Sequence, residues 1–584
     1  MIQDRNRGPQ LEDPSFWAGL QVPELTEDGP QLRDLAEHIP KKAQALVAKK
    51  HSRALWLVFM GGTGTGKSTL VNALCQKQVS RTGVERPKTL GAVVYAHDRE
   101  EVDRILPRFL GPVHSLDAAA ISEGQRGQER GLTLIRHNDS RLQNLVVVDT
   151  PDLDSLVTGH LEMAQDILLM ADAVLFVASQ EKYADEVLYQ ALLSIGRSDK
   201  DLFFVLNKVD TPAGRDARGT LQEVTKALDP GHAFLDQNKC MTLPFVPVGK
   251  GAEDSADMQA FTQAVVSHYA TDAGLKIQAR EKKRIWADIQ SNLVRVDQIL
   301  QTEAGEFQVW EKRLDRAFEQ CLTRLMDREE AGFQAKERQA VQEEIRRVFG
   351  RYDFLAAPRR VIGSCLRLPL KLLGVGGLSR RSREEDLEKA KSKADSRPIQ
   401  EAVDEFNLRV LEELLPANQG SSAGRALRGK GLAMTPEDVQ ARFKAVQEDM
   451  AVWLNERFER MAREAPRGKA WGIYSTSALW GALIISFETV VGGGLTLVEV
   501  LIDSAVAPYV TKGAVELFAY QELRGITREL SAQLKDGIMG IMEEQKNRYV
   551  QAVRDLGPDP RAMEAVRTWA KWSEQEAQAA MNGG

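Results

Sequence analysis

The stretch GGTGTGKS at residues 61–68, which directly follows the apolar run ALWLVFM at 54–60, decides the fold of this chain. It has the spacing of a phosphate-binding loop, in which a glycine and four further residues precede Gly-Lys-Ser or Gly-Lys-Thr. Glycines adopt backbone angles that other residues avoid, so successive N–H groups can turn inward around a phosphate. A helix that begins at Lys67 would direct the positive end of its dipole at the same anion. We therefore expect a buried strand, a nucleotide-phosphate loop and a helix, in this order.

Three side chains have distinct expected roles at the phosphates. The Lys67 ammonium should reach the β- and γ-phosphates, and the Ser68 hydroxyl should bind Mg²⁺. The apolar stretch VVVD at 146–149 reads as a second strand and ends in Asp149. An acid at the carboxyl end of a strand beside a phosphate-binding loop is placed to hold Mg²⁺, usually through water.

The stretch LNKVD at 206–210 indicates which base is bound. In the spacing Asn-Lys-x-Asp, Asp210 can accept hydrogen bonds from N1–H and the N2 amino group of guanine, which adenine does not offer. The Lys208 stem can lie along the purine face, and Asn207 can tie this loop to the phosphate loop. We therefore expect guanine nucleotides to be preferred.

Strand and helix patterns alternate over residues 54–272, as in a doubly wound α/β domain whose helices cover both faces of the sheet. The expected strands span 54–60, 92–96, 132–137, 144–149, 172–178, 202–207 and 244–248. The first 53 residues form an N-terminal segment with a helix that packs on the bundle described next. Pro40 should kink or break this helix, because proline lacks the N–H that a helix interior requires.

Charged helical sequence dominates residues 273–584, where we expect an all-α bundle or stalk. Apolar residues recur every three to four positions, so these helices should pack on one another. The expected helices span 277–300, 304–350, 385–416, 435–465, 510–555 and 559–581. Thr435-Pro436-Glu437-Asp438 is typical of a helix start, with an N-cap, a proline in the first turn and acids at the positive end.

The order of these motifs resembles that of the Ras-like superclass of P-loop GTPases, over roughly residues 54–270. Within it, the sequence is most similar to bacterial dynamin-like large GTPases. The segment RPKT at 86–89 is similar to their arginine-proline switch segment, and the stretches 152–155 and 181–185 also resemble stretches of bacterial dynamin-like sequences. The resemblance implies a domain that binds GTP and GDP with Mg²⁺. By this match Thr89 would close over Mg²⁺ and the γ-phosphate, with Thr82 as the alternative.

The sequence departs from the superclass at several positions. Asp152 replaces the glycine whose N–H meets the γ-phosphate; the N–H remains, but the carboxylate should point away from the phosphate. Leu153 replaces the glutamine that orients water, so another group must do so, either Thr65 or a residue of a partner subunit. Gly249, followed by Lys250, replaces the small Ser or Ala of the last base-contacting loop.

These expectations define a candidate site. The expected catalytic residues are Lys67, Thr89 and Thr65, and the expected metal ligands are Ser68, Thr89 and Asp149. The expected nucleotide-binding residues are Gly61, Gly62, Thr63, Gly64, Thr65, Gly66, Lys67, Ser68, Thr69, Asp152, Asn207, Lys208, Asp210, Gly249 and Lys250.

Two further stretches raise the question of a membrane. Residues 471–510 carry an apolar hairpin pattern around the triple glycine 492–494, which suits either a membrane-inserted paddle or a buried helical hairpin. Residues 359–383 hold seven basic residues and no acid, interleaved with Leu, Ile and Val. This composition suits an anionic membrane surface, with a linker or a nucleic-acid patch as alternatives. It lacks aromatic residues for base stacking, which disfavours nucleic acid.

Composition bears on nucleic-acid binding and on the cellular compartment. The net charge of −6 argues against a surface that binds nucleic acid throughout. The four widely separated cysteines read as reduced thiols of a cytosolic protein, and the N-terminus lacks the apolar core of an export signal. We expect a cytoplasmic protein, peripherally associated with the inner membrane if it binds lipid.

The leading functional hypothesis is a dynamin-like GTPase that couples its nucleotide state to membrane association or remodelling, with a homodimer formed through the GTPase domain or the stalk. Two alternatives stay open. One is an Era-like GTPase associated with the ribosome or RNA, supported only by the basic stretch. The other is a regulatory switch that binds GTP and hydrolyses it slowly, supported by Asp152 and Leu153.

Overall fold

The computed structural model divides the chain into two compact units. Unit 1 comprises residues Met1–Gln21, Gln31–Ile299 and Pro558–Gly584, and unit 2 comprises Val22–Pro30 and Leu300–Gly557. The residues that the structure describes are 11–80, 91–102, 113–117, 132–153, 166–179, 185–209, 217–229, 235–244, 255–332, 339–343, 347, 380–392, 394–416, 420–464, 471–491 and 514–582.

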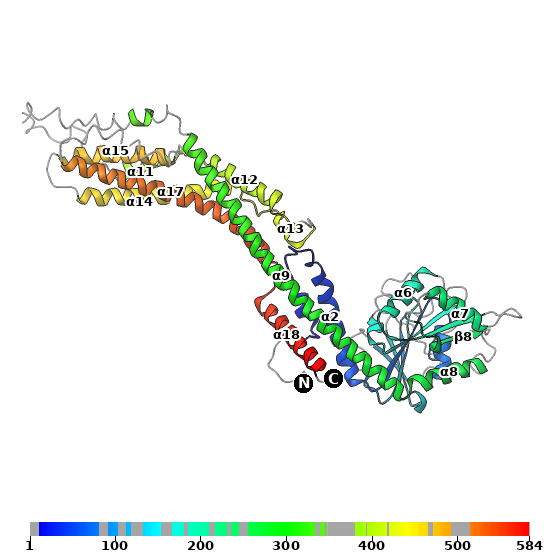
Figure 1. Ribbon diagram of the computed structural model, residues 1–584. Coiled ribbons are helices and arrows are strands. Elements are labelled where there is room, and N and C mark those ends of the chain that lie inside the picture. The colour runs from blue at the N-terminus through cyan, green and yellow to red at the C-terminus, as the bar shows by residue number, and fades with distance from the viewer. Residues whose placement is uncertain are drawn as a thin grey trace, which may run out of the picture. The chain divides into compact units, whose positions relative to one another are not determined.

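Figure 1 shows the β-sheet of unit 1 with helices around it. The sheet has eight strands in the order β3-β4-β2-β5-β1-β6-β7-β8. The strands are β1 (Leu55–Gly61), β2 (Val93–His97), β3 (Val113–Asp117), β4 (Leu132–His137), β5 (Leu145–Asp149), β6 (Ala173–Ser179), β7 (Asp201–Val209) and β8 (Cys240–Pro244). Neighbouring strands are parallel except β2 and β5, which are antiparallel. This is the α/β architecture that the motif order predicts.

Helices cover both faces of the sheet, which explains why its central strands are apolar throughout. Side chains of β1 alternate between two cores: Trp56, Val58 and Met60 join one, and Leu55, Leu57 and Phe59 join the other. The first core is completed by helices α2, α6 and α7, and the second by α3 and α8. Their bounds are α2 (Gln31–His51), α3 (Lys67–Cys75), α6 (Glu186–Arg197), α7 (Ala217–Leu228) and α8 (Ala256–Tyr269).

Several local predictions are corrected by the structure. Strand β3 was not predicted, because VHSLD at 113–117 carries little apolar alternation. Strand β8 begins at Cys240, four residues before the predicted start at 244. Helix α2 continues through Pro40 without ending there. Its buried residues, among them Ala36, Ile39 and Ala43, supply packing that outweighs the hydrogen bond lost at the proline.

Aromatic side chains join the two ends of the chain within unit 1. Trp17 of α1 (Pro14–Ala18) stacks on Trp569 of α18 (Pro560–Asn582), with ring centroids 5.8 Å apart. Trp572 of α18 contacts Trp286 of α9 (Asp272–Gly332) at 5.2 Å. Since large aromatic rings bury 150–250 Å² each as a rough range, these contacts hold α1, α9 and α18 together.

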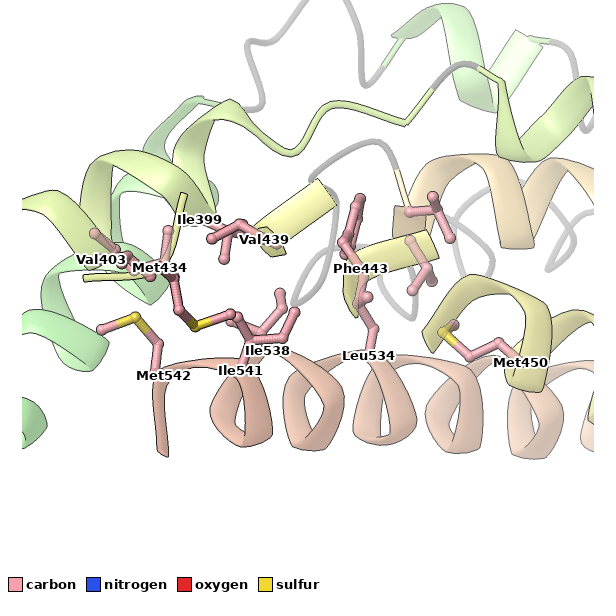
Figure 2. Close-up of a cluster of buried hydrophobic side chains, with 14 of the residues drawn as sticks. Ile399, Val403, Met434, Val439, Phe443, Met450, Leu534, Ile538, Ile541 and Met542 are labelled. Atoms are coloured by element: carbon pink, nitrogen blue, oxygen red, sulfur yellow. The ribbon is translucent and has the colours of Figure 1, made fainter. Parts of the chain in front are cut away.

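Unit 2 is a helical bundle with one continuous core. Besides residues of α9, its helices are α11 (Arg380–Lys391), α12 (Arg397–Glu413), α13 (Ser422–Leu427), α14 (Pro436–Glu464), α15 (Trp471–Val491) and α17 (Ala514–Arg554). Figure 2 shows part of this core, where Val439 and Phe443 of α14 lie near Leu534 and Ile538 of α17. The predicted start of α14 is confirmed, since the Asp438 N–H donates to the Thr435 hydroxyl at 3.2 Å.

The helix boundaries of unit 2 differ from the prediction in two places. The predicted helices 277–300 and 304–350 are one element up to Gly332, because buried residues of α9 continue through Ile299, Leu300 and Glu303 without an interrupting proline. The predicted helix 385–416 is two helices, α11 and α12. Ser396 is the N-cap of α12 and makes no side-chain cap bond, while Asp395 just before it accepts a hydrogen bond from the Arg397 N–H at 3.0 Å.

The described part of the predicted hairpin, α15, packs inside this bundle. Leu483, Phe487 and Val490 are fully buried in the unit 2 core, and Trp480 donates to Asp386 at 3.2 Å. Within the described residues, no helix combines the length and apolarity needed to cross a bilayer. These contacts favour the buried-helix alternative for α15, while 492–510 lie outside the described residues.

Only the last few residues of the predicted basic surface are described. Arg383 is 8% exposed, and its guanidinium lies 5.3 Å from the Phe458 ring centroid and 5.8 Å from that of Trp480. It also pairs with Glu459 at 2.9 Å. Arg383 is therefore part of the bundle and not of a membrane-facing surface, which corrects its predicted role.

A buried aromatic cluster in the sheet makes unit 1 sensitive to acid. His137 stacks on Tyr95 with centroids 4.1 Å apart, and its ring contacts His97 at 5.4 Å. Its Nδ1 accepts from the Asp139 N–H at 3.1 Å, whereas Nε2 is buried without a partner. Burial, and then the charge of His97, lower the pKa of His137 from 6.5 to about 4.

We expect unit 1 to lose about 2 kcal/mol of stability between about pH 7 and about pH 5 through His137 alone. The folded pKa of His137 lies below its unfolded value, so the unfolded chain binds the extra proton as the pH falls from about 6.5 towards about 4. The measurement compares urea unfolding at both pH values for the wild type and His137→Phe, which keeps the ring but does not titrate. An equal pH dependence in the two proteins would contradict the prediction.

Candidate nucleotide site

The loop between β1 and α3 has a backbone that only glycine permits at two positions. Gly61 has φ +152°, and a Cβ there would lie 2.2 Å from the Val177 carbonyl oxygen. Gly66, the N-cap of α3, has φ +102°, and a Cβ there would lie 2.2 Å from Asn207 Nδ2. Because Gly61 and Gly66 lack side chains, Val177 of β6 and Asn207 of the base-recognition stretch can lie close to the loop backbone.

Lys67 lies beneath the loop with its ammonium fully engaged. Its Nζ donates to the carbonyls of Gly61 at 2.9 Å and Gly62 at 3.1 Å, and to Asp152 Oδ1 at 2.5 Å. The side chain of Lys67 is 4% exposed and that of Asp152 is 25% exposed. The carboxylate was expected to point away from the phosphate position; it instead pairs with the lysine that would bind the phosphate.

Ser68 and Asp149 meet at the expected metal position. The Ser68 hydroxyl donates to Asp149 Oδ2 at 2.7 Å, while Oδ1 is buried without a hydrogen-bond partner. Complete burial raises the pKa of Asp149, and the Lys67 charge and the Ser68 hydrogen bond oppose this increase. A hydroxyl and a carboxylate with a spare buried oxygen are the hard donors that Mg²⁺ prefers, so these residues fit that ion.

The predicted base-recognition stretch is attached to the phosphate loop. Asn207 Nδ2 donates to the Thr65 carbonyl at 2.9 Å, and Lys208 Nζ donates to the Gly64 carbonyl at 2.7 Å. The Asn207 Oδ1 in turn accepts the Lys208 N–H at 2.9 Å, and Lys208 has φ +59°. The chain that continues to Asp210 thus leaves β7 beside the loop.

Thr65 and Leu153, which occupy or replace expected water-orienting positions, are both buried in other contacts. Thr65 is fully buried, and its hydroxyl donates to the Gly62 carbonyl at 2.9 Å. Leu153 is 7% exposed and belongs to the core on the α2, α6 and α7 face of the sheet. Its N–H donates to the Gly61 carbonyl at 3.4 Å. Neither side chain presents a polar group for water in this arrangement.

The structure brings together all the predicted site residues that it describes: the loop 61–69, Asp149, Asp152, Asn207 and Lys208. The others, Thr89, its alternative Thr82, Asp210, Gly249 and Lys250, lie outside the described residues, as do 154–155 and 181–184. Sequence reasoning missed the Lys67–Asp152 pair. The available signal was the carboxylate at position 152, where the superclass has a glycine that faces the terminal phosphate and therefore the Lys67 ammonium.

Part of the chain that carries this site is similar to known proteins. Residues 57–209 match the model of the dynamin family. Over 181 residues the chain is 29% identical to an uncharacterized protein in the xynA 3′ region of Caldicellulosiruptor sp. (strain Rt8B.4), a match that covers 30% of this chain and 45% of that protein. Over 182 residues it is 22% identical to Dynamin-like protein A of Bacillus subtilis (strain 168), covering 29% and 14%.

The matches extend over less than half the length of these two relatives. Among solved structures, an oligomerised bacterial dynamin pair described as sensing and tethering membranes is similar over 93% of this chain and 92% of that chain, with 11% identity and a TM-score of 0.38. The domain match coincides with the span from β1 through the phosphate loop to the end of β7. The span from β1 through the phosphate loop to the end of β7 is therefore similar to a domain of the dynamin family.

Proposed function

We propose that this chain binds GTP with Mg²⁺ and hydrolyses it to GDP and phosphate. The observation that carries the proposal is the meeting of Lys67, Ser68 and Asp149 around a loop whose glycines admit no side chain. Asn207 attaches the predicted guanine-recognition stretch to that loop. Isothermal titration with GTP, GDP and ATP in the presence of Mg²⁺ tests it, and a protein that takes up no GTP or prefers ATP would refute it.

The residues of the loop supply charge stabilisation rather than covalent chemistry. Water attacks the γ-phosphate in line with the leaving oxygen, and the Lys67 ammonium and the loop N–H groups stabilise the charge that develops. Ser68 and Asp149 would hold Mg²⁺, which neutralises charge on the β- and γ-phosphates when bound. Thr89 is the proposed further ligand from the switch segment.

Replacing Asp210 with asparagine should weaken GTP binding about 10²-fold and shift the preference towards xanthine nucleotides. Asparagine loses one acceptor for the guanine N1–H and N2 amino group, and its amide can donate to the second carbonyl of xanthine. Competition binding with GTP and XTP measures the change. An unaltered preference would remove Asp210 from base recognition, while Gly249 and Lys250 remain the proposed partners on the other side of the base.

The group that orients water is proposed to come from a second copy of the chain. Leu153 and the Thr65 hydroxyl are both buried in other contacts, which leaves no water-orienting side chain from these two positions. Turnover per molecule should then rise with protein concentration as homodimers form. A rate that is independent of concentration and slow in a single-turnover assay would favour the regulatory GTP switch instead.

We further propose that the protein is cytoplasmic and associates peripherally with anionic membranes through the basic stretch that begins at 359. Each basic residue near an anionic surface contributes about 1 kcal/mol, and interleaved apolar residues can enter the interface. Sedimentation with anionic liposomes, with and without GTP, tests this. Absence of binding in both conditions removes the membrane proposal and leaves the nucleotide chemistry unaffected.

A further inference from the structure

We propose that Asp152 is a built-in counterion of Lys67, which the terminal phosphate of a nucleoside triphosphate must displace in order to bind. This inference rests on the proposed GTP binding and deepens it, because it assigns a residue that sets the affinity for the triphosphate. A residue at this position was expected to contribute only its N–H. The structure instead directs its side chain at the phosphate-binding ammonium.

The ammonium of Lys67 has no hydrogen-bond donor to spare. An ammonium has three protons to donate, and Lys67 directs them at the Gly61 carbonyl, the Gly62 carbonyl and Asp152 Oδ1. No proton is left for an additional acceptor. A phosphate oxygen that binds Lys67 therefore has to replace one of the three partners.

The backbone around the site decides which partner can leave. The two carbonyls belong to the loop itself, and Gly61 is held at the end of β1, where it also accepts the Leu153 N–H. On the other side, the Thr150 N–H and hydroxyl donate to the Phe59 carbonyl at 3.3 Å and 2.7 Å. The backbone on both sides of Asp152 is thus attached to β1. The carboxylate, with its side chain 25% exposed, is the partner that can rotate towards solvent.

The Asp152 carboxylate and the terminal phosphate compete for the Lys67 ammonium because both are anions. A carboxylate and a phosphate that share one ammonium repel each other, so the two anions do not bind Lys67 together without a cost. Asp149, fully buried beside Ser68, adds a second carboxylate to the same site. The terminal phosphate therefore has to compete for Lys67 with an anion that the chain itself supplies.

The experiment compares wild type with Asp152→Asn, which keeps the shape of the side chain and removes its charge. Isothermal titration with Mg²⁺ and a slowly hydrolysed GTP analogue should show about 10-fold tighter binding in the variant. The gain for GDP should be smaller, because GDP lacks the terminal phosphate that competes for Lys67. Glu223→Gln, on the exposed face of α7, is the matched control, since it removes the same charge from the same domain and should change neither affinity.

Two further variants keep the test decisive. Asp152→Gly should reproduce the tighter binding, and Asp152→Glu, which retains the charge, should not. Unchanged or weaker triphosphate binding in both Asp152→Asn and Asp152→Gly would overturn the inference. So would a loss of turnover without a gain in affinity, since it would make Asp152 a group of the hydrolytic step. A wild-type protein that binds no GTP would instead refute the proposed function, so the two failures are distinguishable.

Discussion

Replacing Lys67 with alanine is expected to lower kcat/KM for GTP by at least about 10³-fold. The buried ammonium is positioned by two loop carbonyls, at 2.9 Å and 3.1 Å, so it needs no reorganisation when charge develops on the phosphate oxygens. Its loss removes the cation nearest the β- and γ-phosphates and leaves Asp149 and Asp152 uncompensated. Steady-state phosphate release at saturating and limiting GTP measures the effect.

The matched control for this prediction is Lys226→Ala, which removes an exposed lysine of α7 in the same domain. It should leave kcat/KM within about 2-fold of wild type, because solvent and salt screen the charge of an exposed lysine on α7. Circular dichroism establishes that both variants fold. Hydrolysis by Lys67→Ala within about 10-fold of wild type would mean that the ammonium does not stabilise the transition state.

The second large effect is on stability and concerns the buried pair of Lys49 and Asp172. Lys49 of α2 and Asp172, which precedes β6, have fully buried side chains whose charged atoms are 2.5 Å apart. Asp172 also accepts the Trp56 N–H at 2.9 Å, and Lys49 donates to the Met170 carbonyl at 2.7 Å. Lys49→Met should destabilise unit 1 by about 3–5 kcal/mol, because it leaves an uncompensated carboxylate in the core.

Native-state hydrogen exchange of the β1 and β6 amides measures this loss as a decrease in opening free energy. The double variant Lys49→Met/Asp172→Asn should recover part of it, since neither substitution then leaves a charge unpaired. Lys41→Met provides the control, because Lys41 and its partner Glu37 on α2 are 40% and 63% exposed. Exposed pairs contribute about 0.2–1 kcal/mol, so equal losses in the two variants would contradict the prediction.

Lys67 and the Lys49–Asp172 pair differ in how far the sequence alone could reveal their roles. Lys67 was identified from eight consecutive residues, because the chemistry of the phosphate loop is encoded locally. Lys49 and Asp172 are separated by 123 positions, and nothing in either neighbourhood marks them as partners. Each reads alone as an ordinary surface charge. Only the packing of α2 across the sheet removes both from water and makes their pairing obligatory.

The other elements likewise separate into those encoded by local sequence and those that depend on long-range packing. Local signals predicted the fold class, most strands, and the start of α14 at Thr435. They failed at β3, where the short strand depends on its parallel neighbour β4 for hydrogen bonds, and at Pro40, where burial of one face keeps α2 intact. The apolar sequence of α15 suited a membrane or a core equally, because both environments exclude water. The burial of its described residues in the unit 2 core favours the core alternative over the membrane alternative.

The sequence by itself predicted a phosphate loop, a magnesium site and a guanine-recognition stretch, since each is a short motif whose chemistry depends on neighbouring residues. Tertiary structure alone decided where the Asp152 carboxylate lies. Its position follows from hydrogen bonds that attach residues 150 and 153 to β1. Contacts between segments far apart in the chain set the direction of a side chain, and no local pattern of residues contains that information.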